Sequence, residues 1–158
     1  APKFRDLIHN SCPTITVVPT AGISHISGCT MNLRTTVGRV TFIHELSHII
    51  HNSNPVYYEG VIAQARNLDL SYWEGGFLTY YSKYASRPTD FSTICYSSST
   101  GESYLLDEEF AESVTYFINS NNSEINMGTG CSTKWGDNPY QGGNRYTGHY
   151  NLMSGILK

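Results

Sequence analysis

The pentapeptide His44-Glu45-Leu46-Ser47-His48 constrains this chain more than any other feature of its sequence. It has the form H-E-x-x-H and directly follows an apolar run at residues 40–43. Residues four apart lie on one face of an α-helix, so both imidazoles can bind one zinc ion. Glu45 can then take a proton from a water that the zinc activates. The motif therefore predicts a helix that carries a zinc site, with His44 and His48 as ligands and Glu45 as general base.

Length and charge narrow the classes of protein to which the chain can belong. Its 158 residues, 39% hydrophobic and 15% charged, predict a single globular domain over residues 1–158. With a net charge of −3 it offers no basic surface for nucleic acid. No apolar run approaches the roughly 18 residues that indicate a membrane span, so no membrane insertion is expected. We expect a monomer.

Cysteine usage points to an oxidising compartment. Four cysteines, an even number in a small chain, favour two disulfides in a secreted, extracellular protein. Three pairings are possible; Cys12–Cys29 with Cys95–Cys131 is favoured because each bond closes a local loop on its own side of the zinc helix. Four buried free thiols are the alternative. The start at Ala1, without an initiator Met, fits a mature fragment whose leader was removed.

Hydrophobic spacing predicts strands before the zinc motif and helices after it. Short apolar runs broken by Pro and Gly over residues 7–29 predict one or two strands, and an edge strand could pair with an extended substrate. The zinc helix is expected over residues 35–50, with Thr35 or Thr36 as its cap and residues 52–55 ending it. The remaining predicted elements are helices over 57–68, 73–85 and 105–119 and loops over 87–101 and 128–148.

A catalytic zinc needs a third protein ligand, and acidic residues supply the candidates. His51 and Asn54 stand where the longer metzincin motif requires Gly and a third His, so an acid is expected instead. Glu108 is preferred: on a helix it shares a face with Glu112, which could accept the free N–H of a zinc-bound histidine. The alternative is that these acids bind no metal and form the solvated acidic first turn of the helix predicted over 105–119. The other acids that stay open as ligands are Glu59, Glu74, Asp90 and Glu109.

The segment Glu108-x-Phe110-Ala111-Glu112 resembles the E-x-F-A-E helix of gluzincin peptidases, the group that includes anthrax lethal factor and the Pro-Pro endopeptidases. Ser82-Lys83-Tyr84 is similar to the S-x-Y element of that group, whose Tyr supports the oxyanion. The resemblance covers about residues 39–119 and implies His44, His48 and Glu108 as ligands of one catalytic Zn²⁺. It also implies Glu45 as base and Tyr84 as electrophilic helper.

The implied fold is a zincin-like α+β domain, with a small N-terminal sheet over the active-site helix and a helical lower half. One departure concerns Tyr84, which in the family stands only a few residues before the ligand Glu. Here the loop over 87–101 separates them, so either this loop is an insertion or one assignment is wrong. The alternative for Tyr84 is a packed aromatic beside Tyr80 and Tyr81.

Two weaker resemblances concern other acids. Glu59 follows His48 at about the distance at which deuterolysin-like aspzincins place their ligand Asp, although their G-T-x-D-x-x-Y-G signature is absent. Glu74 resembles the W-x-x-E-G-F of aminopeptidase-like gluzincins, with a different spacing. His51 is expected to face water at the helix end, and His9, His25 and His149 are expected to be structural.

These observations predict a secreted zinc-dependent endopeptidase that hydrolyses peptide bonds through a zinc-activated water, with Glu45 as general base and a protein or peptide as substrate. The alternative is a secreted zinc-binding or effector protein on the same fold without protease activity. Glu45 argues against this alternative because binding alone does not need a base there.

Overall fold

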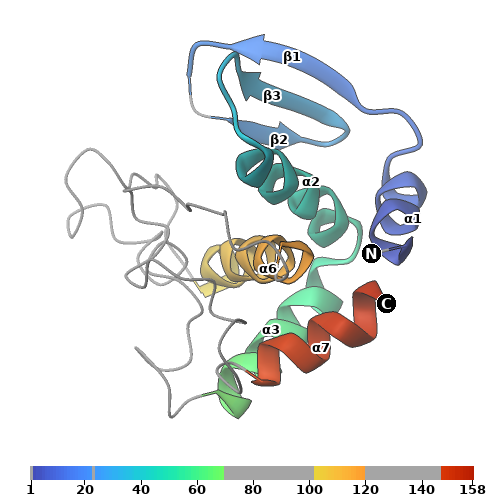
Figure 1. The fold of residues 1–158 in the computed structure, drawn as a ribbon, viewed down its shortest axis with the longest axis vertical. Coiled ribbons are helices and arrows are strands. Elements are labelled where there is room, and N and C mark those ends of the chain that lie inside the picture. Colours follow the sequence, from blue (N-terminus) through green and yellow to red (C-terminus); the bar gives the residue numbers. More distant parts are fainter. Residues whose placement is uncertain (1, 23, 70–101, 120–146) are drawn as a thin grey trace, which may run out of the picture.

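The computed structural model describes residues 2–22, 24–69, 102–119 and 147–158, over which the chain forms five α-helices and one three-stranded sheet (Figure 1). The predicted mixed α+β class is confirmed. In chain order the elements are α1 (Pro2–Ser11), β1 (Thr16–Thr20), β2 (His25–Ser27), β3 (Thr30–Arg34), α2 (Arg39–Ser53), α3 (Pro55–Leu68), α6 (Glu102–Ile118) and α7 (Thr147–Leu157).

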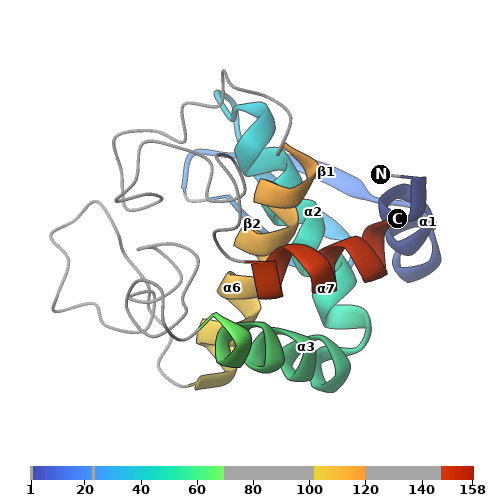
Figure 2. The ribbon, with the colours of Figure 1, turned by 60° about the horizontal axis from the view of Figure 1, so that its bottom comes forward.

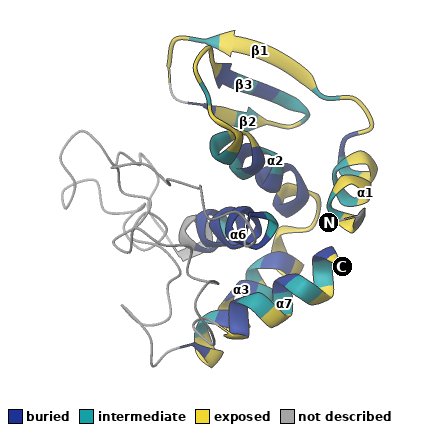
Figure 3. Cartoon of the chain, viewed as in Figure 1, coloured by how far each residue is buried: buried dark blue, intermediate teal, exposed yellow. Residues whose placement is uncertain are grey.

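The sheet has the order β1-β3-β2, with β1 parallel and β2 antiparallel to the central strand β3. It lies along α2 at one end of the molecule (Figure 1). On β3, Met31 and Leu33 are buried, and together with Ile49 of α2 they form a small core. Because side chains alternate across a strand, this pattern turns one face of β3 toward α2. β1, by contrast, is exposed along most of its length (Figure 3).

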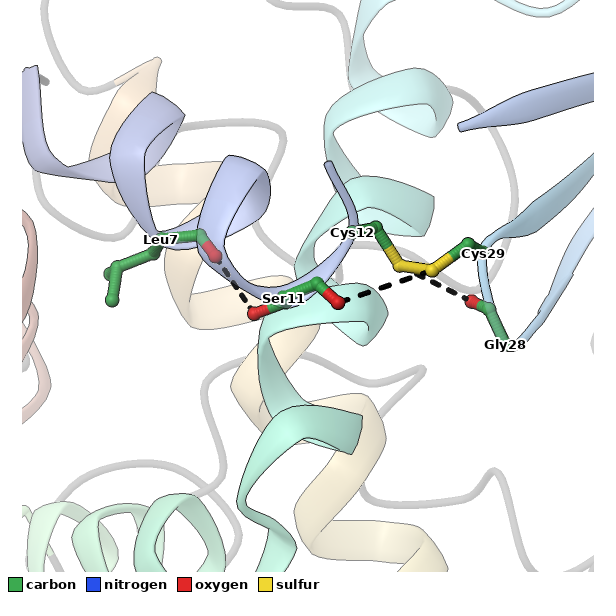
Figure 4. Close-up of a disulfide and its surroundings, with 5 residues drawn as sticks. All are labelled: Leu7, Ser11, Cys12, Gly28 and Cys29. Atoms are coloured by element: carbon green, nitrogen blue, oxygen red, sulfur yellow. Dashed lines mark hydrogen bonds between the residues drawn. A yellow bond between two sulfur atoms is a disulfide. The ribbon is translucent and has the colours of Figure 1, made fainter. Parts of the chain in front are cut away.

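A disulfide closes the N-terminal part of this small core (Figure 4). Cys12, just after α1, is bonded to Cys29 in the β2–β3 turn, with their Cα atoms 5.6 Å apart. Gly28, at φ 57°, makes this turn in the left-handed region that favours glycine. The predicted Cys12–Cys29 pairing is confirmed, whereas the predicted Cys95–Cys131 pairing lies outside the described residues.

The larger core lies between the helices, and α6 is at its centre. From Leu106 onward almost every described side chain of α6 is buried (Figure 3). α2 packs on one side of α6, and α3 and α7 lie on the other (Figure 1). α3 and α7 run side by side (Figure 2). Phe110, Val114 and Phe117, which share one face of α6, belong to this core. The acids Glu108, Glu109 and Glu112 of α6 are buried as well. Because water does not reach them, these side chains must find polar partners within the protein.

The predicted bounds of two helices need correction. α2 begins at Arg39 after Gly38, so neither Thr35 nor Thr36 caps it. These residues instead form the turn that follows β3 directly. α6 begins at Glu102, so its acidic run is not the solvated first turn of a helix. α2 ends at Ser53, three residues beyond the predicted Ile50 but within the segment 52–55 that was expected to end it, and Pro55 opens α3.

Other predicted elements are incomplete or lie outside the described residues. α1, β3 and α7 were not predicted, and α7 begins at Thr147, inside the predicted loop over 128–148. The predicted helix over 73–85 and loop over 87–101 fall among residues that the structure does not describe. In the described part of the chain, none of the helices combines the length and apolarity that crossing a bilayer requires.

Candidate metal centre

The three predicted ligands come together where α2 packs on α6. His44 and His48 stand one turn apart on α2, and Glu108 faces them from α6. One ligand atom from each residue lies within 4.8 Å of the others. The side chains are 13%, 11% and 6% exposed, so the group is nearly enclosed. Among the described residues this is the group of His, Cys, Asp or Glu side chains that could hold a metal ion.

The inward-facing atoms of this group are the two Nε2 atoms and the Glu108 carboxylate. The Nε2 atoms of His44 and His48 lie 3.1 Å apart. Glu108 spans both rings, with Oε2 3.2 Å from His44 Nε2 and Oε1 3.9 Å from His48 Nε2. Two ligands about 2.0–2.1 Å from one zinc ion, at the tetrahedral angle, lie about 3.4 Å apart. The spacing of the two nitrogens is thus close to that of ligands sharing one ion.

Carboxylates on α6 hold the opposite nitrogens of both rings. His44 Nδ1 lies 2.8 Å from Glu112 Oε1, and His48 Nδ1 lies 2.7 Å from Asp107 Oδ1. When each Nδ1–H donates to its carboxylate, each Nε2 carries a lone pair directed into the cluster. Two lone pairs 3.1 Å apart repel unless a proton or a cation lies between them. The donor set, two imidazoles and a carboxylate, fits a divalent transition metal such as zinc.

The predicted contact between Glu112 and a cluster histidine is confirmed, but the matching role of Asp107 was missed. Asp107 stands directly before Glu108 in the acidic run. A metal-binding histidine usually donates its second N–H to a carboxylate or carbonyl. Two metal-binding histidines therefore need two such acceptors. Because only Glu112 was predicted as an acceptor, this requirement could have indicated that a second acid takes part.

Electrostatics in the cluster favour positive charge. Burial lowers the pKa of His44, but hydrogen bonds to Glu108 and Glu112 raise it, and the net result lies well above the ordinary 6.5. For His48, burial also lowers the pKa, while the hydrogen bond to Asp107 raises it, again with a net upward shift. Buried carboxylates are costly unless they are paired. The cluster therefore holds protons or a metal cation more strongly than isolated histidines would.

Glu45 lies beside the cluster and is 6% exposed. Burial raises the pKa of its carboxyl group, and the charges of His44 and His48 lower it. The charge of Glu108 on α6 raises the pKa of the same carboxyl group, and the charge of His25, on strand β2, lowers it. Glu45 thus lies within electrostatic reach of both the ligand group and the sheet edge formed by β2.

The other acids considered as third ligands lie elsewhere. Glu59 Oε1 is 3.6 Å from His51 Nε2, and Glu109 Oε1 is 2.9 Å from His149 Nε2, so neither joins the ligand group. Glu74, Asp90 and Tyr84 lie outside the described residues.

The prediction that His51 faces water is wrong, because the residue is buried, with 4% of its surface exposed. His51 stands three residues after His48, on the side of α2 that α6 covers. Its ring lies 5.9 Å from that of Phe110, and its Nδ1 lies 3.1 Å from Asp107 Oδ1.

The whole arrangement combines three converging ligand atoms, two carboxylates that orient the imidazoles, and a buried carboxyl group beside them. Such a set can hold a divalent cation and keep a base next to it. No protein-family model, no curated protein sequence and no solved structure matches this chain.

Proposed function

We propose that this chain is an extracellular zinc-dependent endopeptidase of the zincin type. The observation that carries the proposal is the convergence of the His44 and His48 Nε2 atoms with the Glu108 carboxylate, next to Glu45 in the same H-E-x-x-H turn. A site that served only to hold the ion would not need a buried acid between its two histidines. The Cys12–Cys29 disulfide supports an oxidising, extracellular setting.

His44, His48 and Glu108 would hold the ion. Glu112 and Asp107 keep both imidazoles in the tautomer whose Nε2 lone pair faces the cluster, through contacts of 2.8 and 2.7 Å. When bound, zinc supplies a Lewis acid that polarises a carbonyl and makes water more nucleophilic at neutral pH.

Glu45 would move the protons. Its carboxylate accepts a proton from the water whose oxygen attacks the scissile carbonyl carbon, and it then delivers that proton to the leaving amine nitrogen as the C–N bond breaks. A general acid–base group works best when its pKa approaches the working pH. Burial raises the pKa of Glu45 in that direction.

Strand β2 would align the substrate. Among the described residues β2 has β3 as its only strand neighbour, so its other edge can pair with an extended peptide. His25 on this strand interacts electrostatically with Glu45, which supports a substrate path along this edge near the proposed base. A peptide paired along β2 would bring its backbone past that base, as cleavage within a chain requires.

The test is cleavage of a diverse peptide library by the zinc-loaded protein, with Glu45→Gln and, as control, Asp6→Asn, which changes an exposed acid of α1. We expect the wild type and Asp6→Asn to cut, and Glu45→Gln to cut at least about 100-fold more slowly while it still binds zinc. If wild type and Glu45→Gln both bind zinc and neither cuts, the chain is a zinc-binding protein instead. Equal cleavage by Glu45→Gln would remove Glu45 as the base.

A further inference from the structure

One carboxylate oxygen of α6 contacts two histidines of α2. Asp107 Oδ1 lies 2.7 Å from His48 Nδ1 and 3.1 Å from His51 Nδ1. A carboxylate oxygen has two lone pairs and can accept both N–H groups. His51 therefore touches the same atom that orients His48, although it lies outside the ligand group itself.

The surroundings of His51 hold its ring firmly. The side chain is 5% exposed, and its ring lies 5.9 Å from Phe110, a fully buried residue of the main core. Its Nδ1 also lies 3.4 Å from Asn52 Oδ1, and its Nε2 lies 3.6 Å from Glu59 Oε1 on α3. Contacts from three helices thus hold the ring in place, and its Nδ1 faces two acceptors, of which Asp107 Oδ1 at 3.1 Å is nearer than Asn52 Oδ1 at 3.4 Å.

Asp107 needs such support. Its side chain is 22% exposed, the highest value among the carboxylates that contact the cluster histidines from α6. A carboxylate that water can reach has alternative partners and rotamers, and its hold on His48 weakens whenever it turns away. A second donor from a buried, packed ring reduces this freedom without adding a ligand to the ion.

We propose that His51 is a positioning residue of the metal centre. It donates its Nδ1–H to Asp107 Oδ1, which keeps that oxygen in place to accept the Nδ1–H of His48. The Nε2 of His48 then stays directed at the ion. This inference rests on the proposed metal site, but it does not depend on peptidase activity.

The test measures zinc affinity by competition with a chelator, and the absorption spectrum of the Co²⁺-loaded protein, for two matched variants. In His51→Gln the amide nitrogen corresponds to Nε2, so the donor to Asp107 is lost. In His51→Asn the amide nitrogen corresponds to Nδ1, so the donor is kept. We expect His51→Gln to lower zinc affinity about 10-fold and to alter the Co²⁺ spectrum, as other residues that orient ligands do. We expect His51→Asn to stay within about 3-fold of the wild type.

The same measurements in an Asp107→Asn background show whether His51 acts through Asp107. We expect His51→Gln to add less than about 2-fold there, because coupled residues are not additive. Unchanged affinity in His51→Gln, an equal loss in His51→Asn, or a full additional loss in the Asp107→Asn background would each overturn the proposal. Failure of the wild type to bind zinc would instead overturn the metal site itself, an outcome visible before any His51 variant is made.

Discussion

Two buried histidine clusters in the described part of the chain combine the same residue types in different arrangements. The candidate metal centre joins His44 and His48 of α2 to carboxylates of α6. The second cluster, which we term the His149 clamp, joins His149 of α7 to Asp69 and Glu109. In the clamp, Asp69 Oδ2 lies 2.7 Å from Nδ1 and Glu109 Oε1 lies 2.9 Å from Nε2. Its side chains are at most 1% exposed.

The two clusters differ in where their nitrogens point. In the clamp a single imidazole separates two carboxylates, which lie on opposite edges of the ring and cannot share one ion. In the metal centre the Nε2 atoms of two rings meet at 3.1 Å beside a carboxylate. Glu108 and Glu109 are adjacent in sequence, yet they belong to different clusters because successive helix residues project about 100° apart. Placement therefore decides which acid can bind a metal, even where composition is the same.

The clamp also secures the start of α7. Asp69 accepts hydrogen bonds from the backbone N–H groups of Gly148 and His149, at 3.0 and 2.9 Å. A carboxylate at a helix N-terminus satisfies free N–H groups and complements the helix dipole. The clamp therefore ties α3, α6 and α7 together.

The largest effect expected from this comparison is the loss of stability in His149→Ala. This change leaves the carboxylates of Asp69 and Glu109 buried without their shared partner, and breaking a buried pair costs about 3–5 kcal/mol. Urea unfolding of the metal-free protein measures it, with the exposed His9→Ala as control, for which less than about 0.5 kcal/mol is expected. A loss below about 1 kcal/mol in His149→Ala would show that the clamp does not stabilise the fold.

His48→Ala should have the opposite selectivity: it should remove zinc binding at the candidate metal centre and leave the His149 clamp intact. Removing a ligand should lower zinc affinity by more than the roughly 10- to 100-fold that supporting residues cost. A ligand present at 100 times its Kd stabilises a fold by about 2.7 kcal/mol, and His48→Ala should lose this gain. His149→Ala, although less stable, should keep it. Thermal unfolding with and without zinc checks both variants, and zinc stabilisation of His48→Ala equal to that of the wild type would contradict the ligand assignment.

The sequence allowed prediction of the parts of the metal centre that follow from one helix at a time. His44 and His48 share a face of α2, and Glu108 and Glu112 share a face of α6, because positions i and i+4 always do on a helix. The role of Asp107 depends on how α6 is rotated against α2, which no local pattern encodes. Tyr84 stays a prediction, since it lies outside the described residues.

The misses in the fold have a similar cause. The start of α7 is secured by Asp69, which is 79 residues from Gly148 in the chain. Two glycines, Gly148 and Gly155, weaken the local helix signal of α7. His51 was expected to face water because it ends an α-helix, but the packing of α6 covers it. In each case a contact distant in sequence overrides the local preference.

Gly148→Ala should disturb the clamp more gently than loss of His149. A Cβ at this position would meet Leu68 Cβ at 2.6 Å and both Ala65 O and Asp69 Cγ at 3.0 Å. Overpacking of this kind costs about 1–3 kcal/mol. Gly155→Ala on the same helix is the matched control, because its Cβ would meet nothing within 4 Å, and it should stabilise α7 by about 0.5–1 kcal/mol. If both variants unfold at the same urea concentration, α7 is not packed as tightly on α3 as described.

The smallest expected effect is the pH dependence that the clamp gives to stability. Burial lowers the pKa of His149, but hydrogen bonds to Asp69 and Glu109 raise it, and the net shift is upward from 6.5. A raised pKa contributes stability that is complete below 6.5 and is lost as pH rises through the folded-state value. Burial raises the pKa of Asp69, whereas its hydrogen bonds with His149 and Gly148 lower it, and the net shift is downward from 3.8.

The contribution of Asp69 is therefore present above 3.8 and disappears as pH falls through its lowered folded-state pKa. The two shifts together predict a plateau between these pH values, with stability falling on either side. Because His44 and His48 also have raised pKa values, the alkaline decline is isolated by subtracting the unfolding free energy of His149→Gln from that of the wild type at each pH. This difference should shrink above pH 6.5, and only partly, since a neutral His149 still fills its site and keeps one hydrogen bond. A difference that is constant from pH 5 to pH 9 would mean that His149 does not change its protonation there, and that the clamp is held by its shape and hydrogen bonds and not by charge.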